Sequence, residues 1–435
     1  MSTESSRTDW THDPVRRSWL DSANVEGAQF PIQNLPLGLY KLQGPARAGV
    51  ALGDQIIDLG FLADEALLPP NLGMHIAAVN AKESLATLMD APADHVVALR
   101  RGLSELFSKD NDPEGASRSL VPLVDAELQL PVKPTAFTDF CASIEHIRGM
   151  AKLHGGPPRL AHGCIPIAYN GRASSVTVSG QAVTRPVGLF EPHRGAGVVC
   201  FGAEPRLDFE LELGAWLRRG PPLGERIPIS LAERHIFGLC LVNDWSARAI
   251  QSLESVLGPH LGKSFHTSVS PWIITTEALA PFRVAARRRE GDEMPVPDHL
   301  LDEDDRAAGA YAIELTAEIS QAGGASVVVT RTHARDLYWT LAQMIAHQSS
   351  GGAPIETGDL IATGTVSGAS TGSRACLAEI NEGAAVPVRF ADGSQRIWLE
   401  DGDTVTIRAF ARAPGHVPIG FGECTATILP SQESY

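Results

Sequence analysis

The chain has 435 residues, enough for two domains that each bury a core, and 43% of its residues are hydrophobic and 20% charged. Its formal net charge is −15 and its only dense basic run is Arg287-Arg288-Arg289, so a nucleic-acid partner is not expected. No apolar run could cross a bilayer and the N-terminus has no signal-peptide core, which predicts a cytoplasmic protein without a membrane anchor.

The first part of the chain predicts a small β unit followed by a helix. We expect residues 1–25 to be a flexible leader. From Phe30 to Gly60, short strand-like runs are broken by Pro and Gly, which predicts an antiparallel unit. A helical pattern follows from Val96 to Phe107, with Asp94 as its expected N-cap.

A stretch rich in Asp, Gly and Ser, Lys109 to Arg118, resembles a linker in composition. We therefore predict a domain boundary between this stretch and Pro134. The expected domains are 26–128, a β domain with helices, and 129–435, a catalytic domain.

The second domain is expected to be mostly β with inserted helices. Glu314 to Ser320 alternates as a strand, and Arg396 to Phe410 carries Asp401-Gly402 between two strand runs, a hairpin signal. His333 to Gln348 predicts an amphipathic helix. The acidic stretch Glu290 to Asp305 predicts an exposed loop.

The cysteines are scattered and no two have CxxC spacing. This pattern favours free thiols in a reducing compartment over a disulfide framework or a zinc site. The six residues are Cys141, Cys164, Cys200, Cys240, Cys376 and Cys424.

The most informative stretch runs from Leu207 to Leu213, because its strict alternation places Glu210 and Glu212 on the same face of a strand. Two carboxylates aimed at one spot repel each other. If Asp139 and Asp244 join them, only a cation or protonation makes the site tolerable. Ligation by oxygen alone suits a hard divalent ion, Mg²⁺, Ca²⁺ or Mn²⁺, better than zinc.

Each of these motifs also has a plain structural interpretation. The alternating acids are typical of a half-buried strand with one wet face. Asp244 stands where an apolar run ends and a helical pattern begins, so it could be a helix N-cap. Asp139 could be a turn residue. No single motif decides between structure and metal binding.

The order of the motifs resembles the fumarylacetoacetase family over nearly the whole chain. The most specific stretches are Thr138-Asp139-Phe140, Tyr169 to Ser175, Asp208 to Leu213, Asn243 to Arg248, Leu261 to Phe265 and Gly364 to Gly368. The resemblance implies a mainly β protein with inserted helices, in which an N-terminal SH3-like barrel precedes a C-terminal mixed β-roll that carries the active site. It also implies a homodimer.

The resemblance implies a role for individual residues by position. The metal ligands would be Asp139, Glu210, Glu212 and Asp244, with Lys263 and Thr267 also at the metal site. His146 matches the general base and Glu379 the carboxylate that orients it. Arg248, Gln251 and Lys263 fall on positions that stabilise an oxyanion, and Tyr169 and Thr365 fall on substrate-contacting ones.

The chain departs from the family where the substrate is held. Cys141 stands in place of a tyrosine, and Ser255 in place of a second one. The segment after the base, from Lys152 to Gly156, is shortened where the family has an arginine, and Arg159 or His154 could replace that donor. Loss of such donors weakens binding of a dicarboxylate. We therefore predict that fumarylacetoacetate itself is a poor substrate.

The function expected from these observations is hydrolysis of a carbon–carbon bond in a β-diketone or acylpyruvate, assisted by Mg²⁺ or Ca²⁺, with Mn²⁺ possible. The alternatives are an oxo-acid decarboxylase or isomerase of the same superfamily, and a non-catalytic member. The presence of both His146 and Glu379 favours hydrolysis, since a decarboxylase needs no base to activate water.

Overall fold

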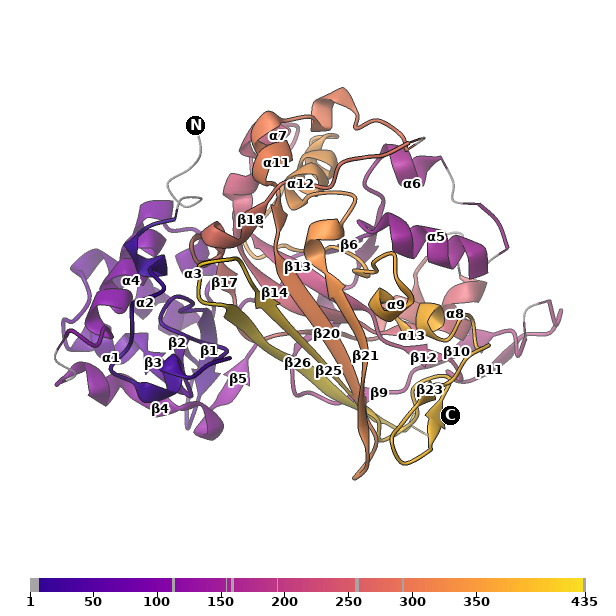
Figure 1. Ribbon diagram of the computed structural model, residues 1–435, viewed down its shortest axis with the longest axis horizontal. Coiled ribbons are helices and arrows are strands. Elements are labelled where there is room, and N and C mark those ends of the chain that lie inside the picture. Colours follow the sequence, from indigo (N-terminus) through magenta and orange to yellow (C-terminus); the bar gives the residue numbers. More distant parts are fainter. Residues whose placement is uncertain are drawn as a thin grey trace.

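The structure, a computed structural model, describes residues 8–111, 114–153, 155–157, 160–193, 195–254, 258–291 and 293–432. A smaller N-terminal unit, indigo to purple in Figure 1, lies beside a larger unit built from the rest of the chain. Strands dominate the larger unit, which confirms the expectation of a mainly β protein with inserted helices. None of the helices in these ranges combines the length and the apolar character needed to cross a membrane.

The N-terminal unit contains a five-stranded sheet in the order β4-β3-β2-β1-β5, with every neighbouring pair antiparallel. This confirms the predicted antiparallel unit. The barrel of SH3 type stays a prediction, as does the division of the chain at residue 128. The strands are β1 (Leu37–Lys41), β2 (Arg47–Leu52), β3 (Gln55–Asp58), β4 (Leu120–Pro122) and β5 (Glu127–Gln129).

Helices cover this sheet, and only one of the four α-helices described here was predicted. The pattern from Val96 to Phe107 does form a helix, but Pro92 holds the N-cap position and Asp94 lies inside the first turn. The expected cap was therefore wrong. The backbone of Pro92 is still extended, and the helix begins at the next residue, Ala93, which leaves Asp94 inside the helix. The helices are α1 (Leu59–Asp64), α2 (Pro70–Lys82), α3 (Ala86–Met89) and α4 (Ala93–Leu106), of which α1, α2 and α3 were missed.

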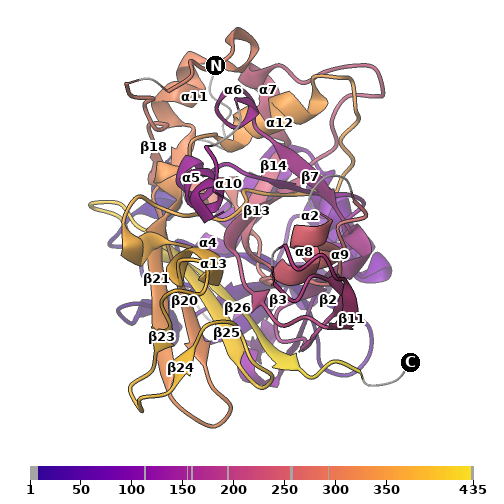
Figure 2. The same ribbon diagram turned by 90° about the vertical axis from the view of Figure 1, so that its right-hand side faces the viewer.

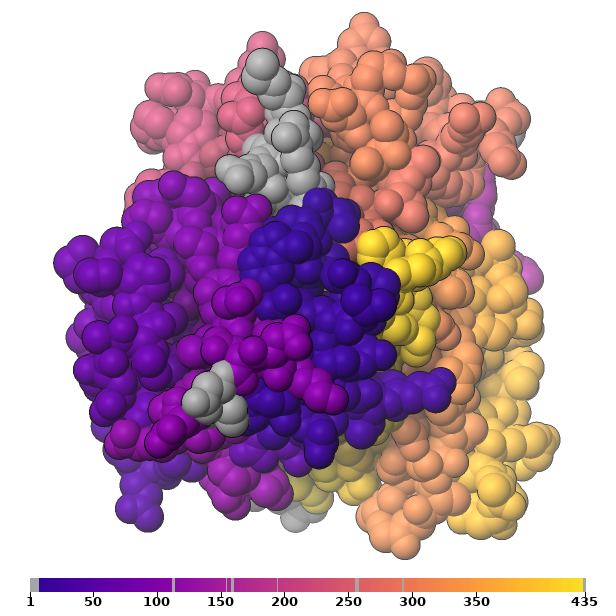
Figure 3. Space-filling view, turned by 60° about the vertical axis from the view of Figure 1, so that its left-hand side comes forward, coloured from indigo at the N-terminus to yellow at the C-terminus, as the bar shows by residue number. Residues whose placement is uncertain are grey.

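Residues 8–25, which we expected to belong to a flexible leader, pack against other parts of the protein. Thr11 and His12 are buried, and the Nε of Arg101 donates to Asp9 at 2.8 Å. Further along, the side-chain amide of Asn34 donates to the carbonyl of Gly420 at 2.7 Å. Figure 3 shows indigo residues beside yellow ones, so the N-terminal segment meets the region around Gly420 where the units join.

The larger unit is centred on an eight-stranded sheet in the order β7-β6-β22-β13-β14-β16-β8, with β17 also paired to β14. Every residue of β13 and β14 is buried. The strands are β6 (Phe137–Phe140), β7 (Ala168–Gly171), β8 (Val176–Val178), β13 (Leu211–Leu217), β14 (Ile236–Asp244), β16 (Thr267–Val269), β17 (Ile274–Thr275) and β22 (Leu360–Ala362).

A second sheet of long strands packs against the central one, in the order β21-β20-β25-β26-β9 (Figure 1). The predicted strand from Glu314 is confirmed as β20. The strands are β9 (Val183–Thr184), β20 (Ile313–Ser320), β21 (Ser326–His333), β25 (Thr404–Ala411) and β26 (Ile419–Leu429). Two-stranded sheets are formed by β10 (Val187–Phe190) with β11 (Cys200–Ala203), β12 (Leu207–Asp208) with β15 (Ser246–Ala247), β18 (Arg283–Val284) with β19 (Ala310–Tyr311), and β23 (Val388–Arg389) with β24 (Gln395–Arg396).

The helices of the larger unit are short. Helices α8 and α9 lie on the side away from the N-terminal unit, near α5 and α13 (Figure 1 and Figure 2). The helices are α5 (Ile144–Leu153), α6 (Ala161–Cys164), α7 (Ile229–Ala232), α8 (Arg248–Leu253), α9 (Leu261–Ser264), α10 (Thr276–Leu279), α11 (Glu303–Ala308), α12 (Leu341–Ser349) and α13 (Leu377–Ile380).

Two local predictions in this unit were wrong, and a third, the loop from Glu290 to Asp305, held except at its C-terminal end. Asp401-Gly402 is a turn but closes no hairpin, because β24 pairs with β23 whereas β25 pairs with β20 and β26. The helix expected from His333 begins only at Leu341, after a capping box made by Thr340 and Gln343. The acidic stretch expected to be a loop contains the start of α11, whose N-cap is Asp302.

Candidate active site

Four buried carboxylates meet at one end of the central sheet. Asp139, Glu210, Glu212 and Asp244 each offer an oxygen, and these oxygens lie within 4.8 Å of one another. None of the four side chains is more than 4% exposed. The predicted convergence is therefore confirmed, and the interpretation of this strand as one with a wet face is wrong.

The sheet itself explains why the acids meet. Strands β6 and β14 run in the same direction and β13 runs in the opposite one, so the last residues of β6 and β14 lie level with the first residues of β13. Alternation places Asp139, Glu212 and Asp244 on the face that carries Phe137, Trp216 and Val242 in the core shared with the N-terminal unit. Three strands far apart in sequence thus aim carboxylates at one point.

Two of the structural interpretations from sequence are wrong. Asp244 ends β14 and caps no helix, since α8 starts only at Arg248 and has no side-chain cap. Asp139 is a strand residue of β6, not a turn residue.

Two cations balance part of the negative charge. The Nζ of Lys263 donates to Glu210 and, at 2.7 Å, to Asp244. The Nη2 of Arg248 lies 2.8 Å from both Asp208 and Glu210. Burial opposes ionisation, but Lys263 and then Arg248 hold the pKa of Glu210 below its usual value.

The remaining acids have no such partner. One oxygen of Asp139 and both oxygens of Glu212 are buried without a hydrogen-bond donor in the described part of the chain. Burial, followed by repulsion from the neighbouring carboxylates, raises the pKa of both groups well above the ordinary range. Orphaned carboxylate oxygens facing one another fit the coordination of a hard divalent ion.

His146 and Glu379 form a hydrogen-bonded pair, as predicted. His146 lies in the first turn of α5, and its Nδ1 is 2.7 Å from Oε2 of Glu379 in α13. Both side chains are buried. Burial alone would raise the pKa of Glu379, but His146 and hydrogen bonds from Ser367 and Cys376 hold it below its usual value. An ionised Glu379 accepts a hydrogen bond from Nδ1–H and leaves Nε2 as the acceptor.

Two buried residues that position this pair were missed in the sequence. The Ser367 hydroxyl donates to Oε2 of Glu379 at 2.6 Å. Asp208 accepts from the backbone N–H groups of Leu377 and Ala378 at 2.6 and 3.1 Å, and from Nε of Arg248 at 2.8 Å. Asp208 could have been found, because it shares the alternation of Glu210 and Glu212; Ser367 carries no comparable signal.

Tyr169, Thr267 and Gln251 also lie at this site. Tyr169 donates its hydroxyl to Asp244 at 2.5 Å, and Thr267 donates to the other oxygen of Asp244 at 2.9 Å. The hydroxyl of Thr365 is buried and has no partner among the described residues. Gln251 accepts from Arg248 at 3.1 Å.

Cys141 and Ser255 were expected to replace two tyrosines of the family. Cys141 follows β6 directly, and burial, then the charge of Asp139, raises the pKa of its thiol, which keeps it neutral. Ser255 lies outside the described residues, as do His154 and Arg159. All six cysteines are free thiols, as predicted.

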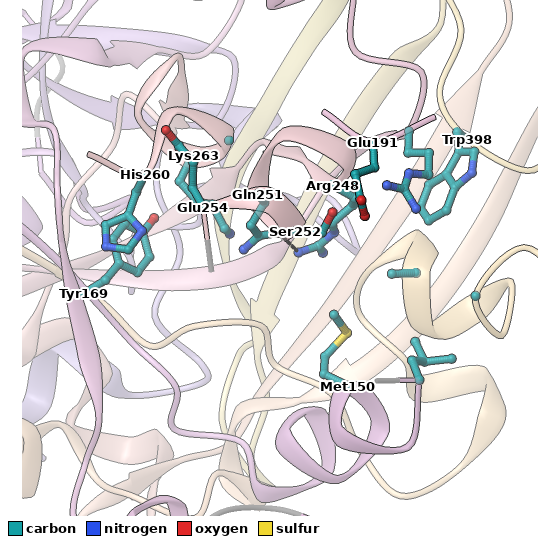
Figure 4. Close-up of a pocket in the computed structure, with 15 residues that line it drawn as sticks. Met150, Tyr169, Glu191, Arg248, Gln251, Ser252, Glu254, His260, Lys263 and Trp398 are labelled. Carbon is teal, nitrogen blue, oxygen red and sulfur yellow. Dashed lines mark hydrogen bonds between the residues drawn. The ribbon is translucent and has the colours of Figure 1, made fainter. Parts of the chain in front are cut away.

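A pocket of about 570 Å³ opens beside these groups. Figure 4 shows Tyr169 and His260 at one end of it, Glu191 and Trp398 at the other, and Arg248 and Gln251 between them. Lys263 also lines the pocket. Because Tyr169 and Lys263 contact the carboxylate cluster, the end of the pocket at Tyr169 is its inner end.

Comparison with known proteins agrees with this geometry. Residues 33–131 match the family model described as fumarylacetoacetase N-terminal, and residues 135–429 match the model described as fumarylacetoacetate (FAA) hydrolase C-terminal. The chain belongs to the fumarylacetoacetase family. Fumarylacetoacetases are therefore its relatives over almost the full length.

Three such relatives from different organisms have similar sequence identities to this chain. The fumarylacetoacetase of Caenorhabditis elegans is 38% identical over 423 residues, which is 93% of this chain and 98% of that one. The enzyme of Oryza sativa subsp. japonica is 37% identical over 429 residues, 95% and 97%. The Homo sapiens enzyme is 35% identical over 423 residues, 94% and 98%.

A solved structure supports the same fold. The fumarylacetoacetate hydrolase from psychrophilic Exiguobacterium antarcticum superposes with a TM-score of 0.51 at 16% identity, covering 91% of this chain and 99% of that one. At this identity the likeness concerns the fold alone.

Proposed function

We propose that this family member hydrolyses the carbon–carbon bond between the carbonyls of a β-diketone or acylpyruvate by means of His146 and Glu379. The protein is a hydrolase acting on carbon–carbon bonds in ketonic substances, like its relatives. The observation that carries the proposal is the buried His146–Glu379 pair, whose His146 lies close enough to Glu210 of the four converging carboxylates to affect its pKa.

The reaction adds water across one bond. A hydroxide adds to one carbonyl carbon, the bond from that carbon to the central CH₂ breaks, and the electron pair leaves on an enolate. Protonation of the enolate turns the CH₂ into a methyl group. The products are a carboxylic acid and a methyl ketone, so R–CO–CH₂–CO–R′ and H₂O give R–COOH and CH₃–CO–R′.

His146 is placed to activate the water. Its Nε2 accepts the proton of water while Nδ1 donates to Glu379, which holds the ring in one tautomer and stabilises the imidazolium that forms. Ser367 keeps the carboxylate of Glu379 in position.

Arg248, Gln251 and Lys263 serve the developing oxyanion. They line one stretch of the pocket and present N–H groups to it. Arg248 and Lys263 are held in place by the acids behind them, so their donors need no rearrangement as charge develops. Tyr169 and Thr365 are proposed to contact the substrate.

A divalent ion, Mg²⁺ or Ca²⁺ with Mn²⁺ also possible, would be held by Asp139, Glu210, Glu212 and Asp244, beside Lys263 and Thr267. The unpartnered oxygens of Asp139 and Glu212 fit such a group. When bound, the ion would polarise the carbonyl oxygens of the substrate.

Substrate choice is expected to differ from that of the relatives. Cys141 offers only a weak donor where the family has a phenol. We propose that fumarylacetoacetate is a poorer substrate here than another diketone or acylpyruvate. A homodimer is also proposed, and light scattering coupled to size-exclusion chromatography measures it.

Product analysis tests the function. A 2,4-dioxo acid incubated with the protein and Mg²⁺ should yield pyruvate and a second carboxylic acid in equal amounts, without release of carbon dioxide. Carbon dioxide release, or isomerisation without cleavage, would instead establish the decarboxylase or isomerase alternative.

A further inference from the structure

The outer end of the pocket has no role in the mechanism above. A substrate that reaches the oxyanion-stabilising residues extends past Arg248 and Gln251, towards Glu191 and Trp398 (Figure 4). Arg206 lines the same pocket. A remote group on the substrate would therefore meet these outer residues.

The segments that carry Arg206 and Trp398 are joined by a backbone hydrogen bond, and both residues line the pocket. The N–H of Leu399 donates to the carbonyl of Leu207 at 3.0 Å. Arg185 strengthens the same junction, because its guanidinium donates to the carbonyls of Glu204 at 2.8 Å and Leu399 at 3.0 Å.

Glu204 ties Arg206 to the helix that carries the oxyanion-stabilising residues. Its carboxylate is 1% exposed and accepts from the backbone N–H groups of Arg206 at 2.7 Å and of Ala249 and Ile250 at 3.0 Å. The N–H of Arg248 donates to the carbonyl of Arg206 at 3.2 Å. The spacing between Arg206 and the oxyanion-stabilising residues of α8 is therefore set by the protein before a substrate binds.

The guanidinium of Arg206 is not engaged elsewhere. It makes no ion pair or side-chain hydrogen bond with other residues in the described ranges, whereas the guanidinium of Arg248 pairs with Asp208 and Glu210. Glu191, the acid at this end, already accepts from the N–H groups of Gly195 and Gly197 at 3.1 and 3.3 Å. A half-buried guanidinium with open donors binds a carboxylate as a planar fork.

We propose that Arg206 and Trp398 form an outer subsite that binds a carboxylate at the end of the substrate remote from the inner end of the pocket. The indole of Trp398 packs on the carbon chain next to that carboxylate and excludes water from the ion pair. The inference rests on the proposed function and identifies Arg206 and Trp398 as residues that determine specificity in that reaction.

Two 1,3-diketones that differ only at the remote end, one with a carboxylate and one with a primary amide, test the subsite. The measured quantity is the ratio of kcat/KM for the acid to kcat/KM for the amide. We expect Arg206→Gln to lower this ratio about tenfold to a hundredfold, mainly through KM, because a hydrogen bond to a charged group is lost. Arg206→Lys should retain part of the ratio, since it keeps the charge without the fork.

Arg389→Gln is the matched control, because Arg389 is exposed in β23 and does not line the pocket. It should leave the ratio at the wild-type value. An unchanged ratio in both Arg206 variants would overturn the subsite and leave the proposed function standing. Wild-type protein that cleaves neither diketone would overturn the proposed function, and the subsite with it. If Arg206→Gln does not fold, Arg206→Lys decides the outcome on the same ratio.

Discussion

Two regions of this protein bury charged side chains, and they treat them in opposite ways. Where the N-terminal segment meets α4, the guanidinium of Arg100 donates to the carbonyls of Gln33 and Asn34 at 2.5 and 2.6 Å and to the hydroxyl of Thr11 at 3.2 Å. In the carboxylate cluster, Glu212 is just as buried and neither of its oxygens has a partner in the described chain.

The difference in hydrogen bonding indicates that the buried charge serves stability at Arg100 and activity at the carboxylate cluster. A buried polar group with local partners stabilises one arrangement of the chain, whereas an unpartnered buried charge costs stability and persists for a ligand or a reaction. Changes near Arg100 should therefore alter stability, and changes in the carboxylate site should alter activity.

His146→Ala should give the largest effect on the activity side. Loss of the base is expected to lower kcat about 100-fold to 10,000-fold, the range of a general base, while the midpoint of thermal unfolding stays close to that of the wild type. Steady-state kinetics and calorimetry on the same sample measure both. Wild-type turnover in this variant would remove His146 from the mechanism.

Gln251→Leu, which keeps the size of the side chain and removes its amide, should follow. Loss of one oxyanion donor is expected to lower kcat about 100-fold or more, with little change in stability because the residue is half-buried. A variant that lost stability and kept its kcat would contradict the assignment of Gln251 to activity rather than stability. Leu253→Gln, on an exposed part of the same helix, is the control.

On the stability side, acid should destabilise the protein through His12. Burial lowers the pKa of His12 to about 4 from 6.5, so the unfolded chain binds more protons between these values. The stability is present above about pH 6.5 and is lost as the pH falls through 4, by up to about 3 kcal/mol. Urea unfolding of the wild type and of His12→Gln at several pH values measures this loss. If the free energy of unfolding depended on pH equally in both proteins, the account would be contradicted.

Ser367→Ala should have the smallest effect. It removes one hydrogen bond to Glu379, worth about 1 kcal/mol, and is expected to lower kcat several-fold without abolishing it. A shift in the pH profile of kcat would distinguish a positioning role from a purely structural one.

The sequence predicted the site better than it predicted the elements around it. Alternation brought out Glu210 and Glu212, because a period of two is a local property, and the family resemblance joined Asp139 and Asp244 to them. Asp208 followed the same period and was nevertheless missed, because nothing local distinguishes a ligand from the acid that holds Arg248.

What could not be predicted depends on pairing between distant strands. The turn at Asp401-Gly402 has the composition of a hairpin, yet β25 finds its partners in β20 and β26. Likewise β22, near residue 361, inserts between β6 and β13. Strand pairing depends on which side chains become buried across the whole sheet. The residues of a single turn do not contain that information.

The central claim is that four converging carboxylates hold one divalent ion, and isothermal titration of metal-stripped protein with Mn²⁺ tests it most directly. Wild type should bind one ion per chain at this site, and Glu212→Gln should lose most of that affinity while the protein remains folded. Binding of equal strength and stoichiometry in both proteins, or no binding in either, would contradict the account.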